Sequence, residues 1–168
     1  MNIKLTKPLV VFDLETTGVQ VANDRIVEIY CIKIQPDGSE EHLHQVLNPT
    51  VPIPPEVSAI HGIWDKDVID KPTFQEFSKM LNTFLGDCDF GGFNSNRFDF
   101  PLLAEEFYRA GVAFDTNRKF IDAQRIFHRM EPRNLTAAYK VYCNKELTDA
   151  HSAKADTVAT WEIIKAQV

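Results

Sequence analysis

Residues 9–18 have the sequence Leu-Val-Val-Phe-Asp-Leu-Glu-Thr-Thr-Gly. Within this stretch, residues 9–13 are rich in β-branched and aromatic side chains, which predicts a strand buried on both faces in the middle of a sheet. Asp13 and Glu15 are two residues apart, so on a strand their carboxylates point to one face, with Cα atoms about 6.6 Å apart, and Leu14 points to the other. If the strand includes them, cations such as Mg²⁺ or Mn²⁺ would offset the repulsion and lost solvation of the two charges. If the strand has already ended, both acids are solvated in a turn, and the pair alone leaves both interpretations open.

The segments after this strand predict an antiparallel meander. Residues 25–35 predict a second strand, and the turn residues 36–39 lead into a third strand that ends near Leu47. Residues 48–55 include four prolines and predict an irregular connection, because proline cannot join the interior of a sheet.

The rest of the chain predicts helices mixed with two further strands. A helix is expected from Thr73 to Gly86, where the apolar side chains recur every three or four residues. The other expected elements are strands at 90–94 and 120–122 and helices at 101–110, 123–129, 134–143 and 152–166. This order predicts an α/β fold with a mixed sheet, and 168 residues fit a single domain, residues 1–168.

Composition indicates an ordinary globular protein, with 44% hydrophobic and 25% charged residues. The first residues lack the apolar region of a signal peptide, and no apolar run approaches the length that spans a bilayer, so we expect a cytoplasmic protein without membrane contact. The net charge of −6 would normally count against a nucleic-acid partner. Metal-binding carboxylates weaken that inference, because bound cations reverse the local field.

Three motifs in the right order resemble those of DEDD-type exonucleases, particularly the proofreading subunit of bacterial DNA polymerase III. Residues 13–18, Asp-Leu-Glu-Thr-Thr-Gly, are similar to the first motif, and residues 94–99, Asn-Ser-Asn-Arg-Phe-Asp, are similar to the second. Residues 151–156, His-Ser-Ala-Lys-Ala-Asp, are similar to the third motif of the histidine branch. Taken alone, Asp99 could simply begin a helix and His151 could be an ordinary surface or core histidine. His151 and Asp156 would be about 140° apart on one helix, so they share a site only if His151 precedes the helix or lies in its first turn.

The resemblance covers nearly the whole chain and implies both the fold and the chemistry. It implies a ribonuclease H-like three-layer fold with a mixed five-stranded sheet, whose first three strands are antiparallel, flanked by helices. It implies a metal-dependent 3′→5′ exonuclease that releases nucleoside 5′-monophosphates from DNA, favouring single strands. Two divalent cations, Mg²⁺ or Mn²⁺, would be held by Asp13, Glu15, Asp99 and Asp156, with His151 as the general base.

The resemblance also implies contacts with the 3′ end of the substrate. The expected substrate-binding residues are Leu14, Thr16, Val19, Glu56, Ile60, His61, Asn94 and Phe98. Without the resemblance, Ile60 would be a hydrophobic loop anchor and His61 a solvent-facing side chain. The chain departs from the family at Phe93, where His is frequent, and at Lys154, where an apolar residue is frequent, and neither change removes a metal ligand.

Two rival functions and the question of partners stay open. An RNA exonuclease of the oligoribonuclease or RNase T kind would use the same ligands, although such chains usually have Met where this chain has Thr16. A catalytically silent nucleic-acid-binding module is disfavoured by the presence of all five expected catalytic residues. Nucleic-acid 3′ ends are the expected partner. A polymerase partner is an alternative, although no C-terminal polymerase-binding extension follows the last predicted helix.

Overall fold

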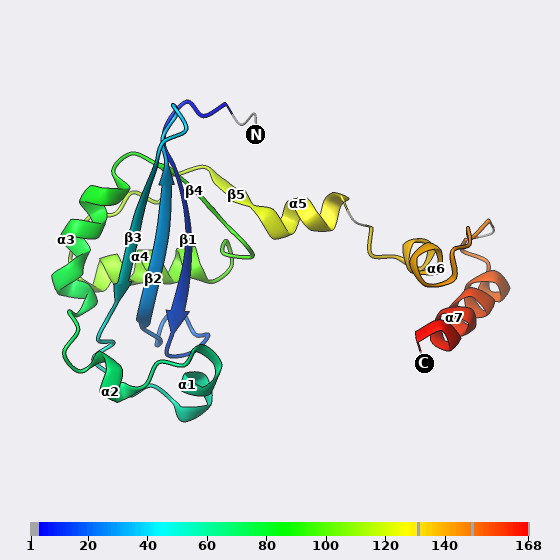
Figure 1. The fold of residues 1–168 in the computed structure, drawn as a ribbon, viewed down its shortest axis with the longest axis horizontal. Helices are drawn as coiled ribbons and strands as arrows, with labels where there is room; N and C mark the ends of the chain where they lie inside the picture. Colours follow the sequence, from blue (N-terminus) through cyan, green and yellow to red (C-terminus); the bar gives the residue numbers. More distant parts are fainter. Residues whose placement is uncertain (1–3, 131, 149, 168) are drawn as a thin grey trace. The chain divides into compact units, whose positions relative to one another are not determined.

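A computed structural model describes residues 4–130, 132–148 and 150–167 (Figure 1). The chain divides into two compact units, residues 1–123 and residues 124–168, and each is described by itself. The expectation of a single domain stays a prediction.

The first unit contains a five-stranded sheet in the order β3-β2-β1-β4-β5. β1 pairs antiparallel with β2 and β2 antiparallel with β3, whereas β1, β4 and β5 run parallel. The strands are β1 (Leu9–Thr16), β2 (Ile26–Ile34), β3 (Glu40–Val46), β4 (Asp89–Gly92) and β5 (Phe120–Asp122). The predicted α/β fold, with a mixed sheet that begins as an antiparallel meander, is confirmed.

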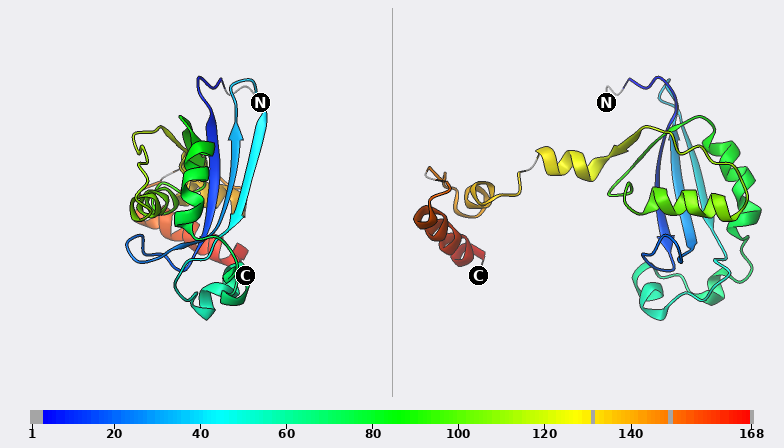
Figure 2. Two further views of the ribbon diagram at one scale, coloured as in Figure 1. Left: turned by 90° about the vertical axis from the view of Figure 1, so that its left-hand side faces the viewer. Right: turned by 180° about the vertical axis from the view of Figure 1, so that it is seen from behind.

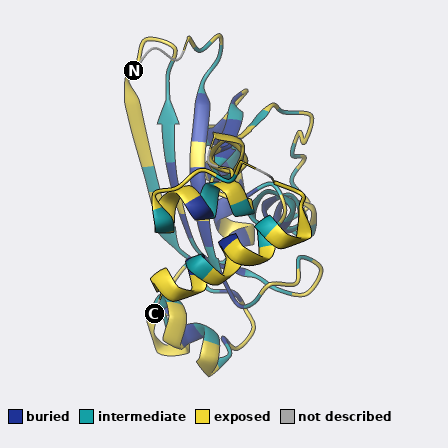
Figure 3. Cartoon of the chain, turned by 90° about the vertical axis from the view of Figure 1, so that its right-hand side faces the viewer, coloured by how far each residue is buried: buried dark blue, intermediate teal, exposed yellow. Residues whose placement is uncertain are grey.

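One face of the sheet is covered by helices α3 (Phe74–Leu85) and α4 (Asp99–Arg109) (Figures 1 and 2). Alternate residues of β1, namely Val10, Phe12 and Leu14, join apolar side chains of both helices in the main core. Buried residues gather accordingly on the central strands of the sheet (Figure 3). The other face of β1 therefore presents the odd-numbered residues.

Helix α3 matches its prediction because both of its ends have strong signals. The Thr73 hydroxyl accepts from the backbone N–H of Glu76, and the Glu76 carboxylate accepts from the N–H of Thr73. Gly86 follows the helix with φ of 55°, and its N–H donates to the Asn82 carbonyl. A capping box at one end and a glycine at the other are what fix such boundaries.

Several boundaries differ from the prediction. Two short helices, α1 (Pro55–His61) and α2 (Asp65–Val68), were not predicted. Pro55 opens α1, because the first turn of a helix needs no N–H from its proline. Helix α4 begins at Asp99, two residues before Pro101, for the same reason. Strand β4 ends at Gly92, so the prediction that it continues to residue 94 is wrong.

The second unit contains helices α6 (Leu135–Cys143) and α7 (Ala153–Gln167), and α5 (Ala123–Met130) spans the boundary between the units. All three agree with the predicted helices to within one residue at each end. Tyr139, Ala159 and Ile163 form a small core between α6 and α7. Among the described residues, no helix is both long and apolar enough to cross a membrane.

Candidate active site

Asp13 and Glu15 both lie within β1, so the interpretation that they sit in a turn is wrong. Their side chains point away from the core, whereas Leu14 is 7% exposed and packs in it. Leu14 can therefore contact a substrate only through its backbone. Within the first unit, Asp13 opens into a groove of about 880 Å³ that is also lined by Phe93 on the loop after β4.

The carboxyl ends of the parallel strands meet beside these acids, as parallel pairing requires. β4 ends at Gly92, and Asn94 then adopts a φ of 61°. The backbone N–H of Asn94 donates to the buried Asp122 carboxylate at the end of β5, at 3.0 Å. This hydrogen bond fixes the start of the loop that carries the second motif to Asp99.

Asp99 is the first residue of α4 and is electrostatically coupled to Asp13. Burial, and next the charge of Asp13, raise the pKa of Asp99 to about 6. Hydrogen bonds from its own backbone, the Ser95 hydroxyl and the backbone of Leu14 act in the opposite direction. The structure thus brings the acids of the first and second motifs together. Among the interactions of the described residues that shift its pKa, no nearby positive charge offsets the burial of ionised Asp99.

Glu15 has the same kind of environment. Burial raises the pKa of Glu15, the charges of Asp13 and Glu28 raise it further, and His61 lowers it. His61 ends α1, its Nδ1 accepts from the Ile63 N–H at 3.1 Å, and its Nε2 is buried without a hydrogen-bond partner among the described residues. The interpretation of His61 as a solvent-facing side chain is therefore wrong.

The expected substrate-contact residues differ in how they are held. Val19 and Ile60 are each 84% exposed, so Ile60 is no hydrophobic anchor. Thr16 is buried, and its hydroxyl donates to the Gly18 carbonyl at 2.6 Å. Phe98 is partly buried and packs against the main core. Glu56 and Asn94 are exposed, and their substrate contacts stay a prediction, like those of the other expected contact residues.

The third motif lies in the second unit. His151 precedes α7, with a φ of 75°, and Asp156 lies in the first turn of this helix. His151 therefore precedes the helix, as it must if His151 and Asp156 are to share one site. The Asp156 carboxylate has one oxygen, Oδ1, that is buried and accepts no hydrogen bond from the described residues.

Within residues 4–130, 132–148 and 150–167, no three or more His, Cys, Asp or Glu side chains are grouped so that they could hold a metal ion. What the first unit provides is a set of three carboxylates, in which the charge of Asp13 raises the pKa of both Glu15 and Asp99. Such a set attracts cations because each added positive charge lowers the cost of ionising all three.

Sequence reasoning missed two side chains that act on the carboxylates, one favourably and one unfavourably. Ser95 is fully buried and hydrogen-bonds to Asp99. Glu28 pairs with Glu15 across β1 and β2 and lies 2.6 Å from Nε2 of His44. Alternation along residues 25–35 could have placed Glu28 on the face of β2 opposite to Ile29. No local signal identifies Ser95.

The substitution Gly92→Ala is expected to destabilise the loop below Asp99. An added Cβ would overlap Oγ of Ser95 and would lie 2.8 Å from Cβ of Ser95 and 3.2 Å from the Phe12 carbonyl oxygen. Because Ser95 is fully buried, it has little room to move, and a loss of about 1–3 kcal/mol in unfolding free energy is expected from such overpacking. Urea unfolding measures it.

Gly91→Ala on the same strand is the matched control for this test. Its added Cβ would meet Cγ2 of Val11 at 3.3 Å, at the end of a side chain that is 38% exposed and has room to yield. A loss at Gly91 equal to that at Gly92 would contradict the prediction.

Comparison with known proteins gives a consistent family assignment. The RNase T family model, described as exonuclease, matches residues 10–164. A PolC-type DNA polymerase III from Bacillus cereus is 29% identical over 90% of this chain and 11% of its own length. The DNA polymerase III subunit epsilon from Treponema pallidum is 34% identical over 56% of this chain and 44% of its own length. The 3′-5′ exonuclease DinG from Staphylococcus epidermidis is 24% identical over 92% of this chain and 17% of its own length. The chain thus spans less than half the length of each of these relatives.

Solved structures share the fold. E. coli exonuclease I in complex with a dT13 oligonucleotide has a TM-score of 0.66 and 19% identity, over 97% of this chain and 41% of that one. The zinc ion bound form of an E. coli exonuclease I complex with single-stranded DNA has a TM-score of 0.66 and 20% identity, over 97% and 40%. These neighbours support the predicted ribonuclease H-like fold.

Proposed function

The chain belongs to the exonuclease family whose model spans residues 10–164, and from this premise we propose that it is a metal-dependent 3′→5′ exonuclease acting on single-stranded DNA. The observation that carries the proposal is the electrostatic coupling of Asp13 with both Glu15 and Asp99 at the carboxyl ends of the parallel strands. Acids held this close to one another suit a reaction that needs cations beside a phosphodiester.

The donor chemistry of the acids suits divalent cations, although the described residues form no preassembled metal-binding cluster. The three acids of the first unit are oxygen donors, as Mg²⁺ and Mn²⁺ prefer, and the charge of Asp13 raises the pKa of both Glu15 and Asp99. Asp156 contributes an unpartnered buried oxygen within the described residues. In the proposal, Asp13, Glu15 and Asp156 hold one cation, and Asp13 and Asp99 hold the other. When bound, the two cations would activate the attacking water and stabilise the leaving 3′ oxygen.

The chain's own residues would bind and orient the 3′ end. Val19 and Ile60 are apolar and exposed, so they can pack against any base and support binding without sequence preference. Thr16 would hold the terminal nucleotide through its backbone, because its hydroxyl is already bonded to the Gly18 carbonyl. His61, beside Glu15, would contact the same nucleotide.

The preference for DNA rests on the relatives. One relative that matches over 90% of the chain is named DNA polymerase III PolC-type, and a solved neighbour is a complex with a dT13 oligonucleotide. The same names make a DNA polymerase the candidate protein partner.

The test is to incubate the protein with 3′- or 5′-labelled single-stranded DNA, duplex DNA and RNA, in Mg²⁺, Mn²⁺ or EDTA. Single-stranded DNA should be shortened stepwise from its 3′ end, releasing 5′-mononucleotides, and EDTA should stop the reaction. Shortening of RNA alone would overturn the DNA proposal. Binding without metal-dependent cleavage of any substrate would leave a silent binding module as the function.

His151→Asn is expected to lower kcat by at least about 10²-fold, because a general base is worth that much. Asparagine suits the test because it tolerates the positive φ of residue 151 better than most residues. Mn²⁺ affinity, measured by calorimetry, should stay close to that of the wild type, since His151 is not proposed as a ligand. The control is His128→Asn on α5, an exposed histidine with no proposed role. Equal loss of metal binding and turnover in His151→Asn would contradict its role as base.

A further inference from the structure

Resting on the proposed function, we infer that Arg109 and Asp24 are positioning residues that hold the loop of residues 17–24 in the shape that receives the 3′-terminal nucleotide. This loop follows β1 directly after Glu15 and Thr16 and carries the exposed Val19. Their printed hydrogen bonds and ion pairs join them to this loop and to α4 rather than to Asp13, Glu15 or Asp99, so both would act through the loop.

Arg109 is the last residue of α4, and its guanidinium hydrogen-bonds to the backbone of this loop. Its Nη1 donates to the Asp24 carbonyl at 2.8 Å, and its Nη2 donates to the carbonyls of Val21 at 3.1 Å and Ala22 at 2.7 Å. A planar fork that donates to three carbonyls of one loop fixes both the position and the orientation of that loop.

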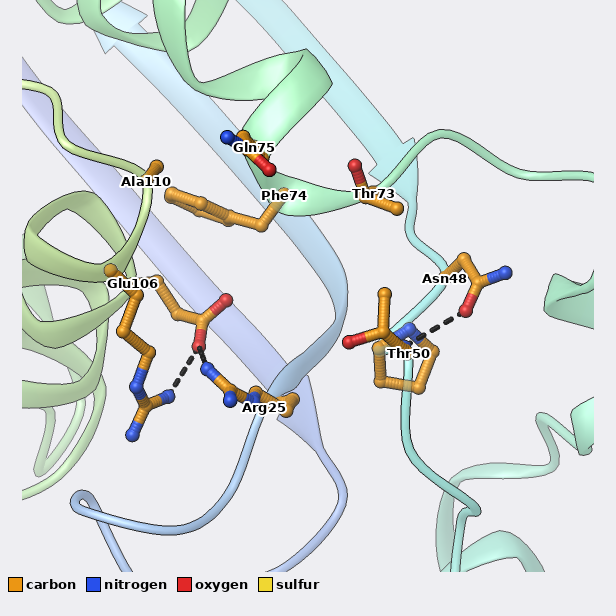
Figure 4. Close-up of a pocket in the computed structure, with 10 residues that line it drawn as sticks. Arg25, Asn48, Thr50, Thr73, Phe74, Gln75, Glu106 and Ala110 are labelled. Atoms are coloured by element: carbon orange, nitrogen blue, oxygen red, sulfur yellow. Dashed lines mark hydrogen bonds and ion pairs between the residues drawn. The ribbon is translucent and has the colours of Figure 1, made fainter.

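Glu106 holds the guanidinium in place. It is 5% exposed and accepts from Nη1 of Arg109. It also accepts from Arg25 at 3.2 Å, and Arg25 is the residue that ends the loop at β2. Figure 4 shows the Arg25 guanidinium directed at the Glu106 carboxylate, across a pocket of about 220 Å³ from Asn48 and Thr73. A buried carboxylate between two arginines holds both guanidinium groups in place, because removing one partner leaves an uncompensated buried charge and costs much stability.

Asp24 organises the loop from inside. Its carboxylate accepts from the Thr17 hydroxyl at 2.9 Å and from the Gln20 N–H at 2.6 Å. The carboxylate packs so close to Gly18 that a Cβ there would lie 2.7 Å from Oδ2. The Thr17 hydroxyl in turn accepts from the Arg25 N–H at 3.0 Å. Asp24 therefore links the contacts of Arg109 to the turn that bears Thr16 and Val19.

Helix α4 thus serves the site at both of its ends. Asp99 begins the helix beside Asp13, and Arg109 ends it against the loop. One rigid element therefore sets the distance between a catalytic carboxylate and the loop proposed to hold the nucleotide, which is how small misplacements of a substrate are avoided.

Arg109→Lys tests the inference, because lysine keeps the charge but lacks the planar fork. We expect KM for a single-stranded oligonucleotide to rise about tenfold, with kcat within about threefold of the wild type. A merely structural role gives the opposite pattern, since a partly unfolded preparation has fewer active molecules and an unchanged KM.

Two further variants keep the test decisive if Arg109→Lys does not fold. Asp24→Asn keeps the backbone carbonyl that Arg109 binds but removes the charge, so a smaller rise in KM is expected. In Arg109→Ala, added guanidinium ion should lower KM toward the wild-type value, whereas sodium at equal ionic strength should not.

Arg118→Lys is the matched control. Arg118 is half-buried like Arg109, and it donates to two backbone carbonyls, those of Gly86 and Cys88, each at 2.8 Å. These carbonyls precede β4, at the end of the strand opposite to the candidate site. Arg118→Lys should lower stability and leave KM unchanged.

Unchanged KM in the Arg109 and Asp24 variants would overturn the inference while leaving the exonuclease activity of the wild type, and so the proposed function, intact. If Arg118→Lys raised KM as much as the Arg109 variant does, the effect would not be specific to the loop, and the inference would also be overturned. A wild type that shortens no substrate would overturn the proposed function and this inference together.

Discussion

Asp13→Asn is expected to lower kcat by about four orders of magnitude, which corresponds to about 5 kcal/mol of transition-state stabilisation. Asp13 is the acid shared between the two proposed cations, and its charge is felt by both Glu15 and Asp99. Asparagine keeps the size of the side chain but removes the charge, so both proposed cations lose an anionic ligand at once. The loss should appear in single-turnover cleavage of 5′-labelled DNA at saturating Mg²⁺.

The same substitution should leave the fold intact. Asp13 points away from the core into the groove, so the unfolding free energy should change by no more than about 1 kcal/mol. Asp37→Asn is the control for loss of one negative charge, because Asp37 is exposed in the turn between β2 and β3 and asparagine suits such turns. If Asp13→Asn kept wild-type activity in Mg²⁺, the two-cation proposal would fail.

The strand that bears these acids could be predicted, and so could their common face. A run of apolar residues before Asp13 and the two-residue spacing to Glu15 are local features, and local features decide strands. What the sequence left open was where the strand ends. β1 continues to Thr16 because β2 pairs with it along its full length, with a bulge at Glu15 and Thr16, and pairing of this kind depends on a partner strand that local patterns do not reveal.

The second motif shows the limit of local signals more clearly. Phe98 and Asp99 were recognisable by their order. The helix was expected from residue 101, because Pro101 is a common first helical residue, whereas α4 begins at Asp99, as the alternative role of Asp99 allowed. The contact between Asp99 and β1 depends on parallel pairing of β1 with β4, which no spacing within residues 94–99 encodes.

The long-range hydrogen bond between the Arg109 guanidinium and the backbone of the loop was beyond sequence reasoning altogether. Arg109 and Asp24 are separated by 85 residues, and neither stands in a recognised motif. Both are charged residues, and charged residues are common anywhere on a protein surface, so their identity predicts no contact. The packing of α4 against the sheet brings them together. Helices of the second unit, by contrast, were predicted closely, because their ends are set by caps such as Asn134, whose side chain accepts from the Ala137 N–H.

Asp99→Asn is expected to change activity and stability in opposite directions. Loss of a cation ligand should lower kcat by about 10³-fold. In metal-free protein the substitution should instead stabilise the fold, because burial and the charge of Asp13 raise the pKa of Asp99 from 3.8 to about 6. A carboxyl whose pKa is higher in the folded state than in the unfolded state costs stability once pH rises above the unfolded value, and the cost is complete above the folded value. At pH 8 the neutral asparagine avoids this cost. Because Asp99 is only half-buried and solvent screens part of the effect, a gain of about 1–2 kcal/mol is expected. At pH 4.5, close to the unfolded pKa, most of this gain should disappear.

Urea unfolding in EDTA at these two pH values measures the difference between Asp99→Asn and the wild type. Adding Mg²⁺ at pH 8 should stabilise the wild type, since cations that bind only the folded state shift the equilibrium toward it, and it should stabilise the variant much less. If the variant were less stable than the wild type in EDTA at pH 8, the negative charge of Asp99 would not destabilise the fold. The main support for cations at this site would then be lost. A gain in stability together with a loss of activity would mean that the acids are kept against the stability of the fold, as expected for residues whose role is catalytic.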